Sequence, residues 1–309
     1  MEYSLSKIST ENHFEIEQLS LKNGGNPNLS EKYINHWYYN NPSKSRSLWK
    51  VLVGGIIEGF ATTNNFVFQI EHTPVLIAMP QNLLTSIKIR GKGFFEKLYK
   101  ETEHENIENN KAESFIVFSN ELSSPIFLNK LGYVKAKCPP VIFSFFNPLD
   151  FFSTPDYKRI YSFDDINNTS VFSFDNAMQK TYAHLQWRYA CYSATQLHMI
   201  EVKKEGAVTG YAFLKVEKKK GISFLILMDI MTENKDAIHH IIDTCYRYAS
   251  RNFFAGLVLF DIPGFVPKRT LRCTFNNRFN VLVKSKAQES TIRLSKVPFC
   301  FFFGDLDIV

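Results

Sequence analysis

A repeated order of landmarks constrains the fold of this 309-residue chain most strongly. Trp37-Tyr38-Tyr39 is matched by Trp187-Arg188-Tyr189, about 150 residues later. Glu58-Gly59-Phe60 is matched by Thr209-Gly210-Tyr211 at nearly the same offset. We interpret these matches as an internal duplication of about 145–150 residues, the usual size of one domain. The alternative is a chance match between aromatic and glycine residues.

Short apolar runs alternate with helical periodicity in the first copy. We expect strands at 48–53, 60–68, 74–79 and 114–118, helices at 93–104 and 123–130, and a last strand that opens at Gly132-Tyr133. This order predicts the α/β class with a mixed sheet. The expected domains are residues 1–147 and 148–309, divided in a proline-containing stretch.

A glycine-spaced loop, Arg90-Gly91-Lys92-Gly93-Phe94-Phe95, stands where a strand pattern gives way to a helix pattern. A helix that begins this way leaves backbone N–H groups unpaired at the positive end of its dipole, which suits an anion. Glycine lets the backbone approach a phosphate, and Arg90 and Lys92 add positive charge. The matching residues 235–240 of the second copy contain no glycine. We therefore expect a phosphate-bearing ligand in the first copy only.

The net charge of +6 does not by itself indicate a nucleic-acid partner, because the basic residues are scattered. The only dense run, Lys218-Lys219-Lys220, precedes Gly221 and is expected to be a hairpin tip. His239-His240 with Asp243 lacks a third ligand at metal spacing, so no metal is expected.

The cysteines and the apolar runs indicate a cytoplasmic protein. Five cysteines, an odd number, are too widely spaced for a disulfide framework and fit a reducing compartment. The N-terminus has no apolar signal stretch. The longest apolar runs, such as 253–260, fall far short of the ~20 residues of a membrane helix, so no membrane partner is expected.

Several segments together resemble the GNAT superfamily of acyl-CoA-dependent N-acyltransferases. In the loop, Arg90 and Gly93 fit the family's phosphate motif, while Phe95 replaces its final small residue. The segment from Ser119 to Pro125 resembles the one that follows the family's fifth strand. The two Trp landmarks and the tail Gly304-Asp305-Leu306-Asp307 are similar to tandem GNAT proteins of polysaccharide gene clusters, including lipopolysaccharide clusters.

The resemblance implies two tandem GNAT-like domains, of which the second lacks the pyrophosphate loop and contributes to the acceptor site. It implies acyl-CoA as cosubstrate. The residues expected to bind it are Leu83, Thr85, Arg90, Gly91, Lys92, Gly93, Phe94, Phe95, Asn120 and Ser123.

The implied reaction transfers an acyl group to the amine of a nucleotide-linked amino-deoxysugar. Acetyl and short hydroxyacyl groups such as 3-hydroxybutyryl both stay open. One alternative is a peptidyl- or aminoacyltransferase of the tandem GNAT type that takes its acyl group from charged tRNA, although such a protein needs no CoA pyrophosphate loop. The other is a non-catalytic binding protein that kept the fold. A homodimer is the oligomer expected on general frequency.

By resemblance, a backbone N–H near Leu84 would stabilise the oxyanion. The general base stays open between four side chains and a route through water or the departing CoA sulfur. The four are Asp229, His184, His36 and Tyr182. Asp229 follows a strand of the second copy, where capping a turn is an equal alternative.

Aromatic and charged residues near the two Trp landmarks are expected to bind the acceptor. The set is Trp37, Tyr39, His184, Trp187, Arg188 and Asp305, with core packing as the alternative for at least two of the four aromatic residues Trp37, Tyr39, Trp187 and Tyr189. Arg188 lies between two aromatic residues and would suit a nucleotide diphosphate.

Overall fold

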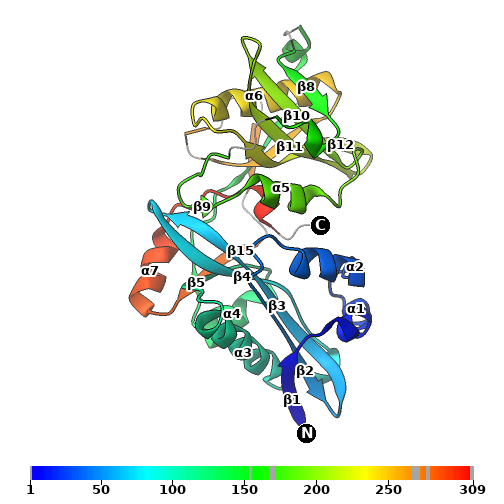
Figure 1. Ribbon diagram of the computed structural model, residues 1–309, viewed down its shortest axis with the longest axis vertical. Helices are drawn as coiled ribbons and strands as arrows, with labels where there is room; N and C mark the ends of the chain where they lie inside the picture. Colours follow the sequence, from blue (N-terminus) through cyan, green and yellow to red (C-terminus); the bar gives the residue numbers. More distant parts are fainter. Residues whose placement is uncertain are drawn as a thin grey trace. The chain divides into compact units, whose positions relative to one another are not determined.

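The computed structural model describes residues 2–145, 147–152, 155–167, 171–262, 264–265, 272–275 and 279–306 (Figure 1). Its contacts divide the chain into two compact units. Unit 1 comprises Met1–Lys137 together with Arg278–Val297. Unit 2 comprises Cys138–Asn277 together with Pro298–Ile308. Asp307 lies outside the described residues.

Unit 1 contains a mixed sheet in the order β1-β2-β3-β4-β5-β15-β6. Its strands are β1 (Tyr3–Lys7), β2 (Arg46–Val53), β3 (Ile56–Ile70), β4 (Thr73–Thr85), β5 (Ser114–Ser119), β6 (Val134–Lys135) and β15 (Asn280–Ser285). Neighbouring strands are antiparallel except β4 and β5, which are parallel. The helices are α1 (His13–Lys22), α2 (Glu31–Ile34) with a π-helical turn (Asn35–Tyr39), α3 (Phe94–Glu108), α4 (Ser124–Lys130) and α7 (Gln288–Lys296).

Alternation along β3 places helices on both faces of this sheet. Ala61 belongs to a buried cluster with Leu98 of α3, and the hydroxyl of Thr63 accepts a hydrogen bond from Asn106 of α3. Thr62, between them, is hydrogen-bonded to Tyr38 of the π-helical turn. Successive side chains of a strand point to opposite faces, so α3 and this turn cover opposite sides.

Unit 2 contains a second mixed sheet in the order β14-β7-β13-β12-β11-β10-β8. Its strands are β7 (Val141–Phe145), β8 (Tyr157–Ile160), β10 (Leu197–Lys204), β11 (Ala207–Lys219), β12 (Ile222–Met231), β13 (Gly256–Phe260) and β14 (Arg272–Phe275), and its helices are α5 (Tyr182–Tyr189) and α6 (Ala237–Arg251). The expected hairpin tip is confirmed, because Lys220 and Gly221 join β11 to β12 with φ of 51° and 84°.

The same order of elements occurs in both units. Three antiparallel strands (β2-β3-β4 or β10-β11-β12) lead to a helix (α3 or α6) and then to a strand parallel to the third (β5 or β13). On its other edge, each of the strands β5 and β13 pairs with an antiparallel strand, which is β15 in unit 1 and β7 in unit 2. The α/β class, the mixed sheets and the two-part layout are thus confirmed. Duplication as their origin stays a prediction.

The compact units differ from the expected division between residues 147 and 148. β7, before that point, belongs to unit 2, while β15 and α7, after it, belong to unit 1. Each unit therefore takes its last antiparallel strand from the other half of the sequence.

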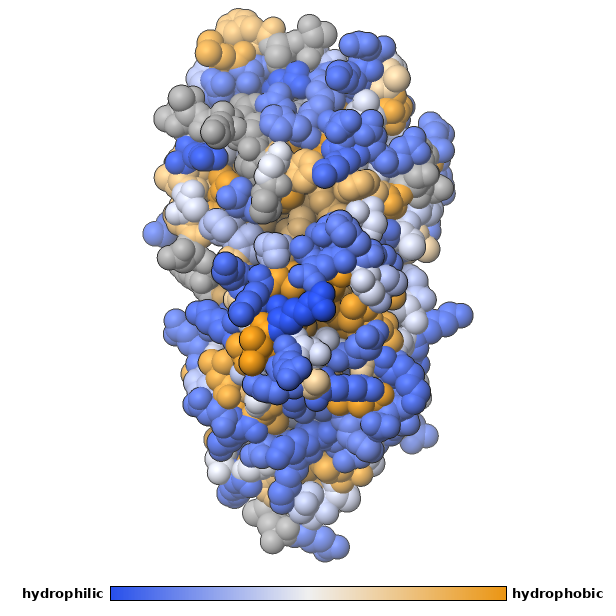
Figure 2. Space-filling model, turned by 90° about the vertical axis from the view of Figure 1, so that its left-hand side faces the viewer, coloured by the Kyte–Doolittle hydropathy of each residue, from blue (hydrophilic) through white to orange (hydrophobic). Residues whose placement is uncertain are grey.

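On the face drawn in Figure 2, hydrophobic atoms form scattered patches among hydrophilic ones. No helix in the described ranges has both the length and the apolar character that crossing a bilayer requires.

Candidate active site

The parallel strands of unit 1 pair over a short distance and then separate. Described pairing joins Ile77 with Ser114 and Ala78 with Phe115. β4 continues to Thr85 and β5 to Ser119. Beyond these residues no described strand pairs with this edge of β4, so its N–H and C=O groups can serve a ligand.

A bulge in β4 lies beside this open edge. The register with β3 shifts between Phe60 and Thr62, and Asn82 has a φ of 46°, a left-handed conformation that Asn tolerates. The side chain of Asn82 donates to the Tyr38 hydroxyl at 2.8 Å and accepts from the Asn26 amide at 3.1 Å. These bonds fix the backbone that leads into Leu83 and Leu84.

The glycine loop follows β4 and opens α3. Gly91 and Gly93 have φ of 78° and 77°, and no atom lies within 4 Å of where a Cβ would stand at either position. Backbone conformation rather than crowding therefore requires glycine there. The first helical hydrogen bond runs from Lys97 N–H to Gly93 C=O. The earlier amides of the helix point out of its N-terminus, where the dipole favours an anion.

Arg90 braces this loop. Its Nε donates to the carbonyl oxygen of Thr85 at 3.1 Å, and its Nη2 donates to that of Asn23 at 3.1 Å. The guanidinium thereby ties the loop to the end of β4 and to the segment after α1.

An open cavity of about 680 Å³ lies over the loop and the end of β4. Of the residues expected to bind the cosubstrate, all except Lys92 line it, and so does Leu84. The sequence prediction missed further lining residues, namely Asn23, Gly24, Gly25, Asn26, Ile89, Glu96, Leu122, Ile126 and Lys130. Asn23-Gly24-Gly25-Asn26, two glycines between two asparagines, was the available signal for this segment.

The side chain of Phe95 has a packing role that explains the departure from the family motif. Its ring is parallel to that of Tyr99 with centroids 6.1 Å apart, and it meets Phe127 edge-on at 6.1 Å. Phe95 thus joins α3 to α4, while its amide belongs to the helix N-terminus.

Asn120 and Ser123 form a capped turn at the edge of the cavity. The Asn120 side-chain oxygen accepts from the N–H groups of Leu122 and Ser123 at 3.0 and 2.9 Å, and from the Ser123 hydroxyl at 3.1 Å. The pair therefore shapes the turn that leads into α4.

Trp37 and Tyr39 lie within unit 1 but do not line this cavity. Trp37 is buried, and its indole N–H donates to Gln81 at 2.7 Å. Tyr39 packs against His13 and under the Arg46 guanidinium.

The remaining expected residues belong to unit 2, where Asp229 is 1% exposed at the end of β12. Lys180 forms ion pairs with Asp229 and Asp305, and Tyr189 donates its hydroxyl to Asp229. Burial raises the pKa of Asp229, and the Lys180 ammonium opposes that rise. Asp229 is thus held in a buried charge cluster.

The expected site residues of α5, His184, Trp187 and Arg188, are also buried. Arg188 donates to the carbonyl oxygen of Leu306, and His184 meets Trp187 edge-on at 5.4 Å. Burial, together with the nearby Lys180 and Arg188 cations, lowers the pKa of His184 to about 3. The imidazole is therefore neutral and weakly basic.

Phe303 and Gly304 lie against the two strands of unit 2 that pair in parallel. Described pairing of β12 with β13 is limited to Leu225 with Leu257 and Ile226 with Val258, as in the first sheet. Phe303 stacks on Phe260 at the end of β13, with centroids 4.4 Å apart. A Cβ on Gly304 would stand 2.1 Å from an Asp229 carboxylate oxygen, at the end of β12. The segment therefore packs against both strand ends.

Solved structures with the same architecture include GCN5-related N-acetyltransferases. One from Anabaena variabilis ATCC 29413 is 12% identical, with a TM-score of 0.68, over 92% of this chain and 73% of that one. One from Kribbella flavida is 10% identical, with a TM-score of 0.66, over 92% and 71%. This chain has the GNAT fold.

Eis1 from Mycobacterium abscessus is a further GNAT-fold neighbour, 10% identical, with a TM-score of 0.64 over 92% of this chain and 74% of that one. No family model and no curated protein sequence matches the chain. At 10–12% identity these neighbours establish the GNAT fold, and the chemistry must be argued from the site. Within the described ranges, no group of three or more His, Cys, Asp or Glu could hold a metal ion.

Proposed function

We propose that unit 1 binds an acyl-CoA and transfers its acyl group to an amine. The observation that carries this proposal is the cavity that joins the helix N-terminus at Gly93 to the open edge of β4. The pyrophosphate of CoA suits the amides at the start of α3, and a pantetheine amide chain suits an unpaired strand edge.

The amine attacks the thioester carbonyl carbon, and the carbonyl oxygen gains negative charge. The backbone N–H of Leu84 donates to that oxygen in our proposal, in a position fixed by the β4 bulge. The tetrahedral intermediate then collapses, the C–S bond breaks, and the CoA thiolate leaves. The proton lost by the amine passes through water or to that thiolate.

The proposed acceptor is the amine of a nucleotide-linked amino-deoxysugar. This choice of acceptor rests on the sequence resemblance. Acetyl and short hydroxyacyl donors both fit an open cavity of about 680 Å³.

Calorimetric titration with CoA and acetyl-CoA tests the donor site. Gly93→Glu puts a carboxylate at the helix N-terminus and strains a residue with a φ of 77°, so CoA affinity should fall at least about tenfold. Gly221→Glu is the matched control, because Gly221 has a φ of 84° and equally open surroundings but lies at the tip of a hairpin in unit 2. Its CoA affinity should equal that of the wild type.

Absence of CoA binding by the wild type, or equal loss in both variants, would overturn the donor site. If CoA binds, thiol release in the presence of a panel of nucleotide-linked amino sugars tests the acceptor. If the thiol of CoA is released with simple amines but with no member of the panel, the nucleotide-linked amino sugar is ruled out as acceptor. The proposal of acyl transfer to an amine would still stand.

A further inference from the structure

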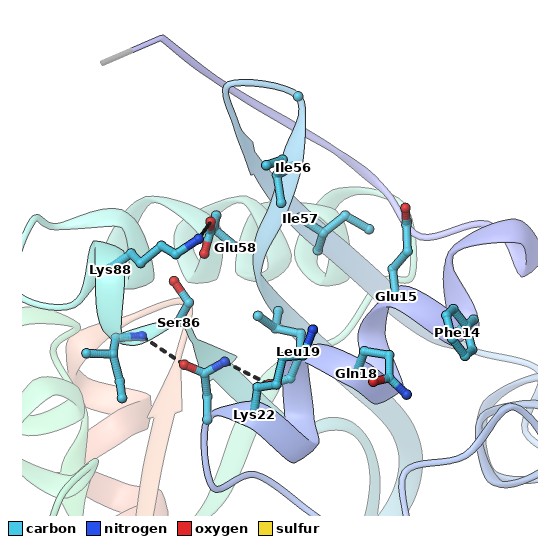
Figure 3. A pocket seen from close by; sticks show the side chains of 13 residues that line it. Phe14, Glu15, Gln18, Leu19, Lys22, Ile56, Ile57, Glu58, Ser86 and Lys88 are labelled. Carbon is cyan, nitrogen blue, oxygen red and sulfur yellow. Dashed lines mark hydrogen bonds and ion pairs between the residues drawn. The ribbon is translucent and has the colours of Figure 1, made fainter.

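Unit 1 has a second cavity, of about 550 Å³, outside the proposed donor site. It lies between α1, the turn from β2 to β3, and the segment that follows β4 (Figure 3). Its lining residues are Phe14, Glu15, Gln18, Leu19, Lys22, Asn23, Gly55, Ile56, Ile57, Glu58, Ser86, Ile87 and Lys88. We call it the α1 cavity.

Two buried polar residues line the α1 cavity. Glu58 and Ser86 are 7% and 4% exposed. The Ser86 N–H donates to the Glu58 carbonyl oxygen at 2.7 Å, and the antiparallel register next to them pairs Gly59 with Thr85. The two residues are therefore cross-strand neighbours, whose side chains lie on the same face.

Few described hydrogen-bond or ion-pair partners offset the cost of burying these two groups. The described ion pair of Glu58 is with Lys88 at 3.3 Å, and the Lys88 side chain is 77% exposed (Figure 3). The Ser86 hydroxyl has no hydrogen-bond partner among the described residues. A buried carboxylate and hydroxyl are costly unless donors satisfy them, and an exposed lysine is a loosely held donor.

The walls of the cavity combine apolar side chains with the polar Glu15, Gln18 and Lys22. Leu19 and Ile57 are buried, while Phe14 and Ile56 expose most of their side chains at the rim. A ligand that fits this arrangement has a cationic donor at one end and an apolar body at the other.

We propose that the α1 cavity binds a primary ammonium carried on an aryl or alkyl body. The ammonium takes the place of the Lys88 ammonium on Glu58 and donates to the Ser86 hydroxyl, while the apolar body covers Leu19, Ile57 and Phe14. This site goes beyond the proposed acyl transfer and does not depend on it.

The α1 cavity and the cavity of the proposed donor site share one lining residue, Asn23. Its side chain accepts from the Ile87 N–H at 2.9 Å, and its carbonyl oxygen accepts from Arg90. Asn23 thus forms a wall between them, and a small amine in the α1 cavity should bind without displacing CoA.

Titration with phenethylamine, followed by protein NMR shifts, tests the site, and 2-phenylethanol is the uncharged counterpart. The wild type should bind the amine saturably and at least about tenfold more tightly than the alcohol. Glu58→Gln should lose that preference, and Ser86→Ala should weaken amine binding about threefold.

Lys88→Met gives the decisive result, because it removes the internal competitor. It should strengthen phenethylamine binding at least about threefold, whereas Lys22→Met, at another lysine of the same cavity, should leave it unchanged. Lys88→Met keeps the proposal testable even if Glu58→Gln fails to fold. Absence of saturable binding, equal affinity for amine and alcohol, weaker binding by Lys88→Met, or competition with CoA would each overturn the proposal.

Discussion

His184 makes unit 2 sensitive to acid. Burial and two neighbouring cations hold its pKa at about 3, well below the ordinary value of 6.5. Below pH 6.5 the unfolded chain takes up a proton that the folded unit refuses. The contribution of His184 to the free energy of unfolding of unit 2 is therefore fully present above pH 6.5. It is lost as the pH falls towards 3, by up to about 1.4 kcal/mol per pH unit.

We expect acidification from pH 7 to 5 to cost unit 2 roughly 2 kcal/mol through His184. Asp229 offsets part of this loss, because its raised pKa favours proton uptake by the folded unit over the same range. His184→Gln should flatten this pH dependence, as measured by calorimetric unfolding at each pH. His104→Gln, at an exposed histidine of α3, is the control and should keep the wild-type slope. An unchanged slope in His184→Gln would contradict this assignment.

The aromatic and charged residues chosen for an acceptor show the limit of single-residue prediction. Trp37 and Trp187 are buried, and Arg188 bonds a backbone carbonyl of the last described segment. A sequence names a side chain but not its partner, and the partners of Arg188 and Asp229 lie far along the chain, at Leu306 and Lys180. Their assignment to an acceptor stays a prediction.

At the scale of elements, the spacing of apolar residues was enough to predict most strands and helices of unit 1. The glycines of the loop at 90–95 were enough to predict the loop, and both have a positive φ in the structure. The β4 bulge did not follow, because it depends on hydrogen bonds from Asn82 to Tyr38 and Asn26 that sequence distance hides. The segment Asn23–Asn26 carries two glycines between two asparagines, but that pattern does not show which cavity the fold brings it to.

The bulge gives a test of how β4 is positioned. Tyr38→Phe removes the hydroxyl that joins Asn82 to Thr62, at 2.8 and 2.7 Å, while keeping the ring. Leu83 and Leu84 should then be held less firmly, so acyl transfer should slow about tenfold while CoA affinity, set by the loop, stays within about twofold. Thiol-release kinetics and calorimetry measure the two effects. A parallel loss of CoA affinity would show that the bulge merely supports the fold.

At the scale of the whole molecule, unit 1 is completed by residues from the far end of the sequence. β15 supplies Val281, Leu282 and Val283, all fully buried, and it pairs with β5. No local pattern could predict this pairing, because a strand gives no sign of which edge it joins.

A fragment of residues 1–147 should therefore fail to unfold cooperatively, since it leaves the β5 edge open and the core unfilled. Residues 1–137 joined by an Asn-Gly turn to residues 280–297 should unfold cooperatively, because β6 and β15 are antiparallel with Lys135 opposite Leu282. Circular dichroism during heating compares the two chains. Equal cooperativity in both would show that β15 is dispensable.

Because each unit takes one strand from the other half of the sequence, neither can complete its sheet until that strand has been synthesised. After Lys137 leaves the ribosome, unit 1 must wait for all of Cys138–Asn277 before β15 emerges, a delay on the order of ten seconds at ordinary rates of elongation. Unit 2 in turn waits for Pro298–Ile308. A stop codon before β15 would therefore leave both units incomplete, unit 1 without β15 and α7 and unit 2 without the segment that begins at Pro298.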